Sequence, residues 1–167
     1  MSVNDIFYPI FSLQLSISSD IKFRQMNIPD EEEKEILERS KVIAIAGLSP
    51  KEGKPSNVVA QYLIVSGYTI IPVNPQYNEI LGRKCYKNLS DIPEPVDIIN
   101  IFMRPENVLP IVEEAIKIKP KCIWLQLGVV NEEAKRLAEM HGILFFMNVC
   151  IKQEHTRLSV QSEQQAG

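Results

Sequence analysis

Residues 41–57 are KVIAIAGLSPKEGKPSN, and the rest of the chain can be placed from this stretch. The run from Lys41 to Ala46 is small, branched and apolar, which is typical of a strand buried on both faces of a parallel sheet. A loop rich in Gly, Ser, Pro and Lys follows, and apolar residues then recur at helical spacing, so Ser56 or Asn57 is predicted to cap a helix. Strand, glycine turn and capped helix are typical of a nucleotide-binding α/β unit, because free N–H groups at a helix start favour an anion.

The spacing of this loop matches neither of the common phosphate-binding motifs. It is not G-x-G-x-x-G, and it is not the P-loop G-x-x-x-x-G-K-[ST], because Lys54 and Pro55 follow Gly53. By itself the stretch therefore leaves open an alternative, a tight strand-to-helix connection that binds nothing.

The composition limits the class of protein. With 167 residues, 45% hydrophobic and 23% charged, the chain fits one globular domain. The net charge of −3 and a pI near 5.5 argue against a nucleic-acid binder, since such proteins carry a basic surplus. Three widely spaced cysteines without C-x-x-C encode neither a disulfide framework nor a zinc site, so we expect a cytoplasmic protein. No membrane span and no signal peptide are predicted.

Strand and helix patterns alternate along the chain. Strands are predicted at 41–46, 68–73, 96–102, 121–127 and 142–147, and helices at 29–40, 56–66, 105–117 and 132–140, the last capped by Asn131. This alternation predicts right-handed crossovers and a parallel sheet. We therefore predict an α/β fold that is Rossmann-like and doubly wound, with a five-stranded parallel sheet in the order 3-2-1-4-5 and helices on both faces.

One domain is predicted over residues 29–158. Residues 1–28 mix helical and alternating spacings and form an N-terminal extension of uncertain order, with Met26 as an alternative start. Residues 159–167 are polar and rich in Gln and Ser, which is typical of a flexible tail.

The residue after the second predicted strand is Asn74, where a dinucleotide site ordinarily has an acidic side chain for the ribose hydroxyls. A carboxylate would repel a phosphorylated ribose, whereas an amide can donate and accept. Asn74 therefore favours the 2′-phosphate of NADP or the 3′-phosphate of coenzyme A. The cations that could pair with that phosphate are Lys51, Lys54, Arg83 and Lys84, each of which by itself is also compatible with ordinary solvated charge.

Open parallel sheets bind ligands outside the carboxyl ends of their strands. Residues 47–49, 74–77, 103–105, 126–128 and 148–155 are predicted to gather at that edge, with Arg104 as a candidate phosphate clamp. The rim offers several hydrogen-bond donors.

Groups suited to catalysis are few. His141 is expected to be structural or exposed, and His155 is expected to tie down the C-terminal segment, although an acid–base role stays open. Cys150 is expected to be buried and inert, with a mixed disulfide to a ligand thiol as the alternative. Metal-ligand spacing is absent from the sequence.

Six motifs, taken in their order and spacing, resemble the small stand-alone CoA-binding proteins. These motifs are Gly47-Leu48-Ser49-Pro50, Val73-Asn74-Pro75, Leu81-Gly82-Arg83, Ile92-Pro93-Glu94-Pro95-Val96-Asp97, Trp124-Leu125-Gln126-Leu127-Gly128 and Cys150-Ile151-Lys152-Gln153-Glu154-His155. The family consists of single Rossmann-like domains similar to the CoA-binding domain of the succinyl-CoA synthetase α subunit. The resemblance covers roughly residues 28–158. One departure is Asn148-Val149, where many members have an Asp-Arg pair before the final Cys.

The resemblance implies that coenzyme A or an acyl-CoA binds at the carboxyl edge of the sheet. The candidate binding residues are Gly47, Leu48, Ser49, Pro50, Lys51, Ser56, Asn57, Asn74, Pro75, Tyr77, Met103, Arg104, Gln126 and Gly128. The synthetases that share the fold add a phosphohistidine domain and an ATP-grasp partner, so an autonomous ligase is not expected.

We therefore expect a small binding or regulatory protein that is not an enzyme. The alternatives are an NADP-binding oxidoreductase and a CoA-binding subunit of a multi-chain acyl-CoA synthetase. The expected partner is the small-molecule CoA ligand, with no nucleic acid and no membrane, and a homodimer stays open.

Overall fold

The computed structural model describes residues 30–165, with side chains described over 31–159, so the extension predicted at 1–28 lies outside the described residues. The chain divides into a unit of residues 1–35 and a unit of residues 36–167, and the sheet belongs to the second. The elements, in chain order, are α2 (Asp30–Arg39), β1 (Val42–Ala46), α3 (Pro55–Val65), β2 (Thr69–Val73), β3 (Glu79–Ile80), β4 (Arg83–Lys84), η1 (Leu89–Asp91), β5 (Ile98–Ile101), η2 (Pro105–Asn107), α4 (Val108–Ile118), β6 (Cys122–Leu125), α5 (Glu132–Met140), β7 (Leu144–Phe146) and α6 (Ile151–Gln165).

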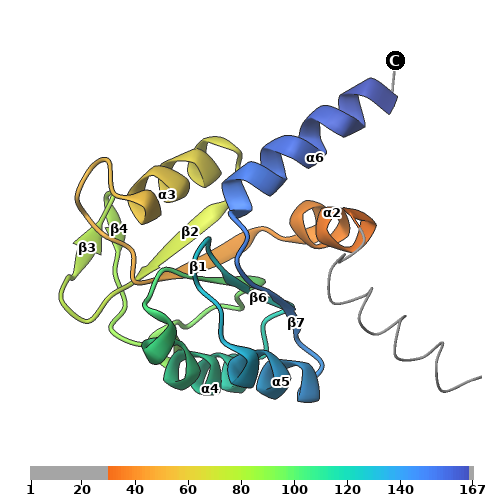
Figure 1. The fold of residues 1–167 in the computed structure, drawn as a ribbon. Helices are drawn as coiled ribbons and strands as arrows, with labels where there is room; N and C mark the ends of the chain where they lie inside the picture. The colour runs from red at the N-terminus through yellow and green to blue at the C-terminus, as the bar shows by residue number, and fades with distance from the viewer. Residues whose placement is uncertain (1–29, 166–167) are drawn as a thin grey trace, which may run out of the picture. The chain divides into compact units, whose positions relative to one another are not determined.

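The centre of the fold is a five-stranded sheet in the order β2-β1-β5-β6-β7, and every pairing in it is parallel (Figure 1). The helices α3 and α6 lie on one side of the sheet and α4 and α5 on the other. The predicted α/β class, the number of strands and their parallel direction are therefore confirmed. The predicted cap of α5 is also confirmed, because the Asn131 side chain accepts a hydrogen bond from the Ala134 N–H at 2.9 Å.

The predicted strand order 3-2-1-4-5 differs from the observed order in the position of one strand. The third strand of this sheet along the chain, β5, pairs directly with β1 and does not lie outside β2, so the order counted along the chain is 2-1-3-4-5. The connection from β2 to β5 holds a short antiparallel β3–β4 ribbon and the single turn η1. Its residues Leu89 and Ile92 pack with α4, on the side opposite α3. A right-handed crossover on that side carries the chain back past β1.

This order fixes the position of the switch point. The connection that leaves β1 runs toward β2, whereas the connections that leave β5 and β6 run the other way, so strand order reverses between β1 and β5. Ligands of open α/β sheets bind at such a reversal, outside the carboxyl ends of the two strands. The loops after β1 and β5 are therefore the centre of the candidate site.

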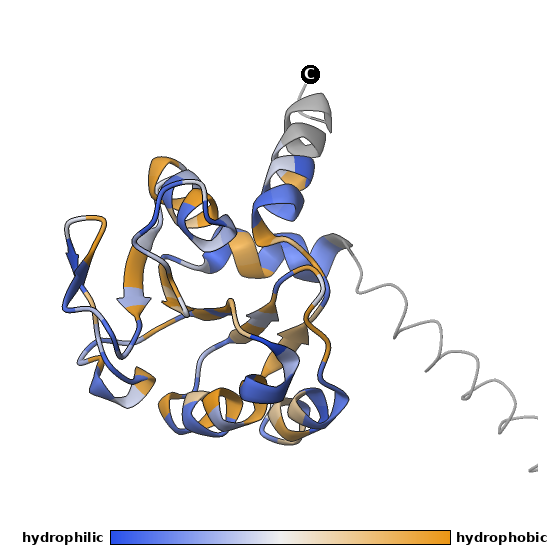
Figure 2. Cartoon of the chain, turned by 60° about the vertical axis from the view of Figure 1, so that its left-hand side comes forward, coloured by the Kyte–Doolittle hydropathy of each residue, from blue (hydrophilic) through white to orange (hydrophobic). Residues whose placement is uncertain are grey.

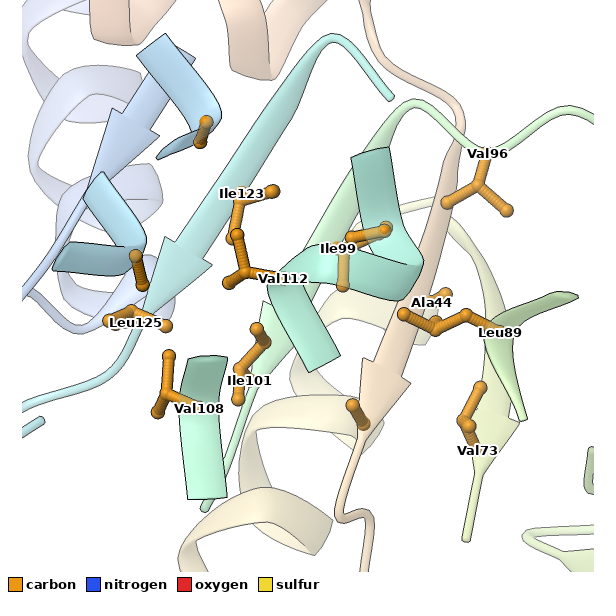
Figure 3. Packing of buried hydrophobic residues seen from close by; sticks show 14 of the residues in the cluster. Ala44, Val73, Leu89, Val96, Ile99, Ile101, Val108, Val112, Ile123 and Leu125 are labelled. Carbon is orange, nitrogen blue, oxygen red and sulfur yellow. The ribbon is translucent and has the colours of Figure 1, made fainter. Parts of the chain in front are cut away.

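The sheet face under α4 and α5 is an apolar core. Ile99, Ile101 and Leu125 point to this side and pack against Val108 and Val112 of α4 (Figure 3). Each of these side chains is fully buried. Figure 2 shows the strands of the main sheet largely in the hydrophobic colour and α4 and α5 in both colours, as expected of helices with one buried side. Packing of this kind supplies most of the stability of a domain of this size.

The face under α3 and α6 also buries polar side chains. Because side chains alternate along a strand, Asn100 points away from the side that Ile99 and Ile101 occupy. Gln126 hydrogen-bonds to Asn100 and therefore lies on the same side. Ser56 and Asn57 of α3 are buried as well. Buried polar side chains therefore distinguish this face from the apolar face under α4 and α5.

The sequence predicts no helix after residue 147, and the structure has the C-terminal helix α6 there. The backbone is helical to Gln165, past residue 158, where the flexible tail was expected to begin. No helix within residues 30–165 is long and apolar enough to cross a membrane.

Candidate functional site

Gly47 follows β1 and sets the position of the loop. Its φ is +81°, and a Cβ atom there would collide with the carbonyl oxygen of Phe102, the first residue after β5. Its N–H donates to the carbonyl of Val73, at the end of β2, at 2.9 Å. Only glycine combines this conformation with such a close approach. The ends of β1, β2 and β5 are thus drawn together around Gly47.

The loop after β1 is held by the first turn of α3. The Ser49 N–H donates to Ser56 Oγ at 3.1 Å, and Asn57 Nδ2 donates to the Ser49 carbonyl at 2.9 Å. The prediction that Ser56 or Asn57 caps the helix is wrong, because α3 begins at Pro55 and Lys54 is the N-cap. A proline suits the first helical position, which lets the helix start earlier. The two side chains bind the loop instead.

The start of α3 presents N–H groups without a side-chain cap. Lys54 makes no capping hydrogen bond, and the N–H groups of Ser56 and Asn57 belong to the first turn, where a helix offers no acceptor. Lys51 and Lys54 are exposed, and no acidic group pairs with either within residues 31–159. Backbone donors, the helix dipole and these ammonium groups favour an anion at this place.

Asn74 joins the loop after β1 to the turn after β2. Its Nδ2 donates to the carbonyl of Leu48 at 3.0 Å, and its Oδ1 accepts from the Gln76 N–H at 3.0 Å. Both ends of the amide are thus engaged within the protein, and its contact with a ribose stays a prediction. Leu48 is fully buried, so only its backbone can face a ligand. Pro75 is exposed and Tyr77 half-buried at the same turn.

Cations surround the end of β2. Arg83 donates to the Leu81 carbonyl at 3.3 Å, and the Lys84 ammonium lies 4.7 Å from the centre of the Tyr86 ring. Lys87, which the sequence did not single out, donates to the Tyr77 carbonyl at 2.9 Å. These side chains are fixed by backbone and ring contacts, and their charges stay available to an anion.

The loop after β5 brings an apolar and a basic residue to the switch point. Met103 is half-buried and packs against the apolar core, with its Cγ 3.4 Å from the place where a Cβ on Gly47 would lie. Arg104 precedes η2 and is exposed. Over the part of the chain with described side chains, no carboxylate pairs with Arg104. Its guanidinium can therefore take a phosphate.

The end of β6 carries a buried amide and a fixed glycine. Gln126 Nε2 donates to Asn100 Oδ1 at 2.6 Å, and Asn100 Nδ2 has no partner although the side chain is fully buried. The Gly128 N–H donates to Asn148 Oδ1 at 2.9 Å, so this donor is engaged. Asn148 has a φ of +58° there, which Asn tolerates. Sequence reasoning missed Asn100, although a polar residue within an apolar strand was a visible signal.

The histidines have structural contacts. The Tyr62 hydroxyl of α3 lies 2.9 Å from His155 Nδ1 of α6, which confirms the predicted role of His155 in tying down the C-terminal segment. Burial lowers the pKa of His155 below its ordinary value. His141 is exposed, with Nδ1 2.9 Å from the Leu137 carbonyl. Cys150 is a half-buried free thiol, and no metal-ligand cluster exists among the described residues.

Comparison with known proteins places this geometry in a family. A family model described as a CoA binding domain matches residues 41–156. The chain is 42% identical over 122 residues to the uncharacterized protein YneT of Bacillus subtilis, covering 73% of this chain and 90% of that protein. A solved structure of a hypothetical protein from Pyrococcus horikoshii OT3 is 42% identical with a TM-score of 0.77, covering 79% of this chain and 93% of that one.

A third relative is larger than this chain. The chain is 31% identical over 132 residues to an ADP-forming acetate–CoA ligase I of Archaeoglobus fulgidus. The match covers 73% of this chain and 19% of the ligase. The similarity thus concerns about a fifth of that enzyme.

Proposed function

The chain belongs to the CoA-binding domain family, and from that premise we propose that it binds coenzyme A or an acyl-CoA as a binding or regulatory protein without chemistry of its own. The observation that carries the proposal is the start of α3, where uncapped N–H groups lie beside the unpaired Lys51 and Lys54 in a chain of net charge −3. A local cation cluster in an acidic protein favours a small phosphorylated ligand over a polyanion.

The order of the strands suggests how the ligand lies along the edge. The diphosphate of CoA would meet the start of α3, close to Arg104 on the neighbouring loop after β5. Its 3′-phosphorylated ribose would lie on the β2 side, among Arg83, Lys84 and Lys87. The pantetheine arm, which carries amides and the thiol, is then left to run over β5 and β6.

A titration tests this proposal. Calorimetry with CoA, dephospho-CoA, NADP and NAD should show the strongest binding for CoA, with dephospho-CoA weaker because it lacks the 3′-phosphate. Native mass spectrometry of protein purified without added ligand should show a bound mass of CoA or an acyl-CoA. Binding of NADP without any response to CoA would contradict the proposal and favour an oxidoreductase.

A second candidate is the CoA-binding part of an acyl-CoA synthetase assembled from several chains. The similarity to ADP-forming acetate–CoA ligases favours it. Such a role would need phosphoryl transfer, and His155 is the histidine to test, although its Nδ1 is already engaged by Tyr62. Intact-mass analysis after incubation with ATP distinguishes the two: a phosphate on His155 supports the subunit, and an unchanged mass supports the simple binding protein.

A further inference from the structure

A buried amide pair lies beneath the carboxyl edge of the sheet, on the side of α3. Asn100 occupies the middle of β5, level with Ile45 of β1 and Trp124 of β6. Gln126 follows β6 directly and reaches back to Asn100, with 2.6 Å between Nε2 and Oδ1. Asn100 is 0% exposed and Gln126 5% exposed. The two residues therefore join the interior of the sheet to its rim.

The pair is incomplete in hydrogen bonds. Asn100 Nδ2 has no partner, and turning both amides over would leave Asn100 Oδ1 unpaired in its place. No donor reaches the Gln126 oxygen within residues 31–159. Buried polar groups are ordinarily paired, so each exception needs an explanation in water, ligand or function. A leucine at position 100 would fill similar space without this cost to folding.

The position of Gln126 along the rim indicates what it would meet. Gln126 lies two strands from β1, roughly 10 Å from the loop at the start of α3. The cations Arg83, Lys84 and Lys87 lie on the other side of that loop, beside β2. No cation belongs to the amide pair itself. The nucleotide half of the ligand is therefore directed away from Gln126, and its uncharged amide-bearing half toward it.

We propose that the Asn100–Gln126 pair hydrogen-bonds the pantetheine arm of the ligand, with Gln126 as the contact and Asn100 as the positioning residue. This inference rests on the proposed binding of CoA. The buried bond to Asn100 holds the Gln126 carboxamide in one orientation, so its second polar atom faces the arm, whose amides can donate to it. Folding alone does not require the unpaired Asn100 Nδ2.

The test compares whole and truncated ligands. The dissociation constants of CoA and of adenosine 3′,5′-bisphosphate, which lacks the arm, are measured by calorimetry for the unaltered protein, Asn100→Leu and Gln126→Leu. Glu113→Leu, which alters an exposed side chain on α4, is the control. Thermal unfolding is recorded for all four proteins, so that a folding defect is separated from a binding defect.

We expect about a tenfold rise in the CoA dissociation constant for Asn100→Leu and Gln126→Leu, as one lost hydrogen bond suggests. The constant for adenosine 3′,5′-bisphosphate should stay within about twofold in both variants. Equal weakening of both ligands, or no change in CoA binding, would overturn the inference while the proposed function stands. Failure of the unaltered protein to bind CoA would overturn both.

Discussion

The two faces of the sheet are made by alternate residues of the same strands, and they differ in what they bury. On the α4 and α5 face, Ile99 and Ile101 belong to the apolar core. On the α3 and α6 face, Asn100 sits between those two residues in sequence and is equally buried. One face is suited to holding the fold together, and the other carries polar groups that packing does not require. We infer that stability and ligand binding are separated by face.

The largest effect is expected from Ile99→Ala, on the apolar face. Removing this fully buried side chain should lower the free energy of unfolding by about 2–5 kcal/mol, from lost burial and the cavity left behind. Chemical denaturation measures the loss. CoA affinity, measured well below the unfolding transition, should stay within about twofold. A large loss of CoA affinity in the folded variant would break the separation of the faces.

The cations that we propose to bind phosphate should show the opposite behaviour. Lys51→Ala or Arg104→Ala should weaken CoA binding by about 1.5–3 kcal/mol, as a lost charge-assisted hydrogen bond suggests, with stability unchanged because both side chains are exposed. Calorimetry provides the measurement, and Lys117→Ala, an exposed lysine of α4, is the control. If the substitution weakens the binding of dephospho-CoA as much as that of CoA, the altered residue contacts the diphosphate and not the 3′-phosphate.

Gly47→Ala should affect both stability and CoA affinity, because Gly47 follows β1 and approaches the end of β5 closely. The left-handed backbone costs about 1 kcal/mol for alanine, and the collision with the Phe102 carbonyl adds to it, for a loss of about 1–3 kcal/mol in stability. CoA affinity should fall as the loop moves. Gly67→Ala has a φ of +96° with nothing near the added atom, so it should show the backbone cost alone. Similar losses of stability in both variants would show that the close approach of Gly47 to the Phe102 carbonyl contributes nothing to the effect.

Much of the fold follows from local pattern. The apolar run at 41–46 and its counterparts predict the strands of the sheet, since burial on both faces leaves an unmistakable pattern. Strand order is harder to predict, because it depends on which side of the sheet a connection takes. The β2–β5 connection contains no full helix to reveal its path. The ribbon of β3 and β4 was missed because each strand has two residues, too few for a period.

The sequence predicted where the candidate site lies better than it predicted the hydrogen bonds within the site. Gly47, Met103, Arg104 and Gln126 lie at the carboxyl edge as parallel topology requires. Hydrogen bonds over long sequence separations could not be foreseen. Asn74 holds Leu48 across 26 residues, and Gln126 holds Asn100 across the same separation. The predicted order keeps β5 and β6 apart, so it hides the second pairing, whereas β1 and β2 are neighbours in both orders.

The smallest effect on stability is expected from Asp97, which lies at the amino ends of the strands, at the edge of the sheet opposite the candidate site. The Asp97 carboxylate lies 2.7 Å from Lys121 Nζ and accepts from the N–H groups of Lys41 and Val42 at 2.8 and 3.0 Å. Burial by itself would raise the pKa of Asp97, but the hydrogen bond from Lys121 and those from the two backbone N–H groups outweigh burial and lower it.

A lowered pKa in the folded protein means that the charged form contributes stability. This contribution is present above the unfolded pKa of about 3.9 and is lost as the pH falls through the lower, folded value. Asp97→Asn should therefore flatten the acid limb of stability against pH, measured by denaturation between about pH 5 and pH 2. The change should be small, because the lysine side is half exposed to solvent. CoA affinity at neutral pH should not change, since this edge lies a full strand length from the switch point. A variant that lost CoA binding without losing stability would show that the two edges are coupled through the strands, and the separation of binding from packing would then fail along the sheet as well as across it.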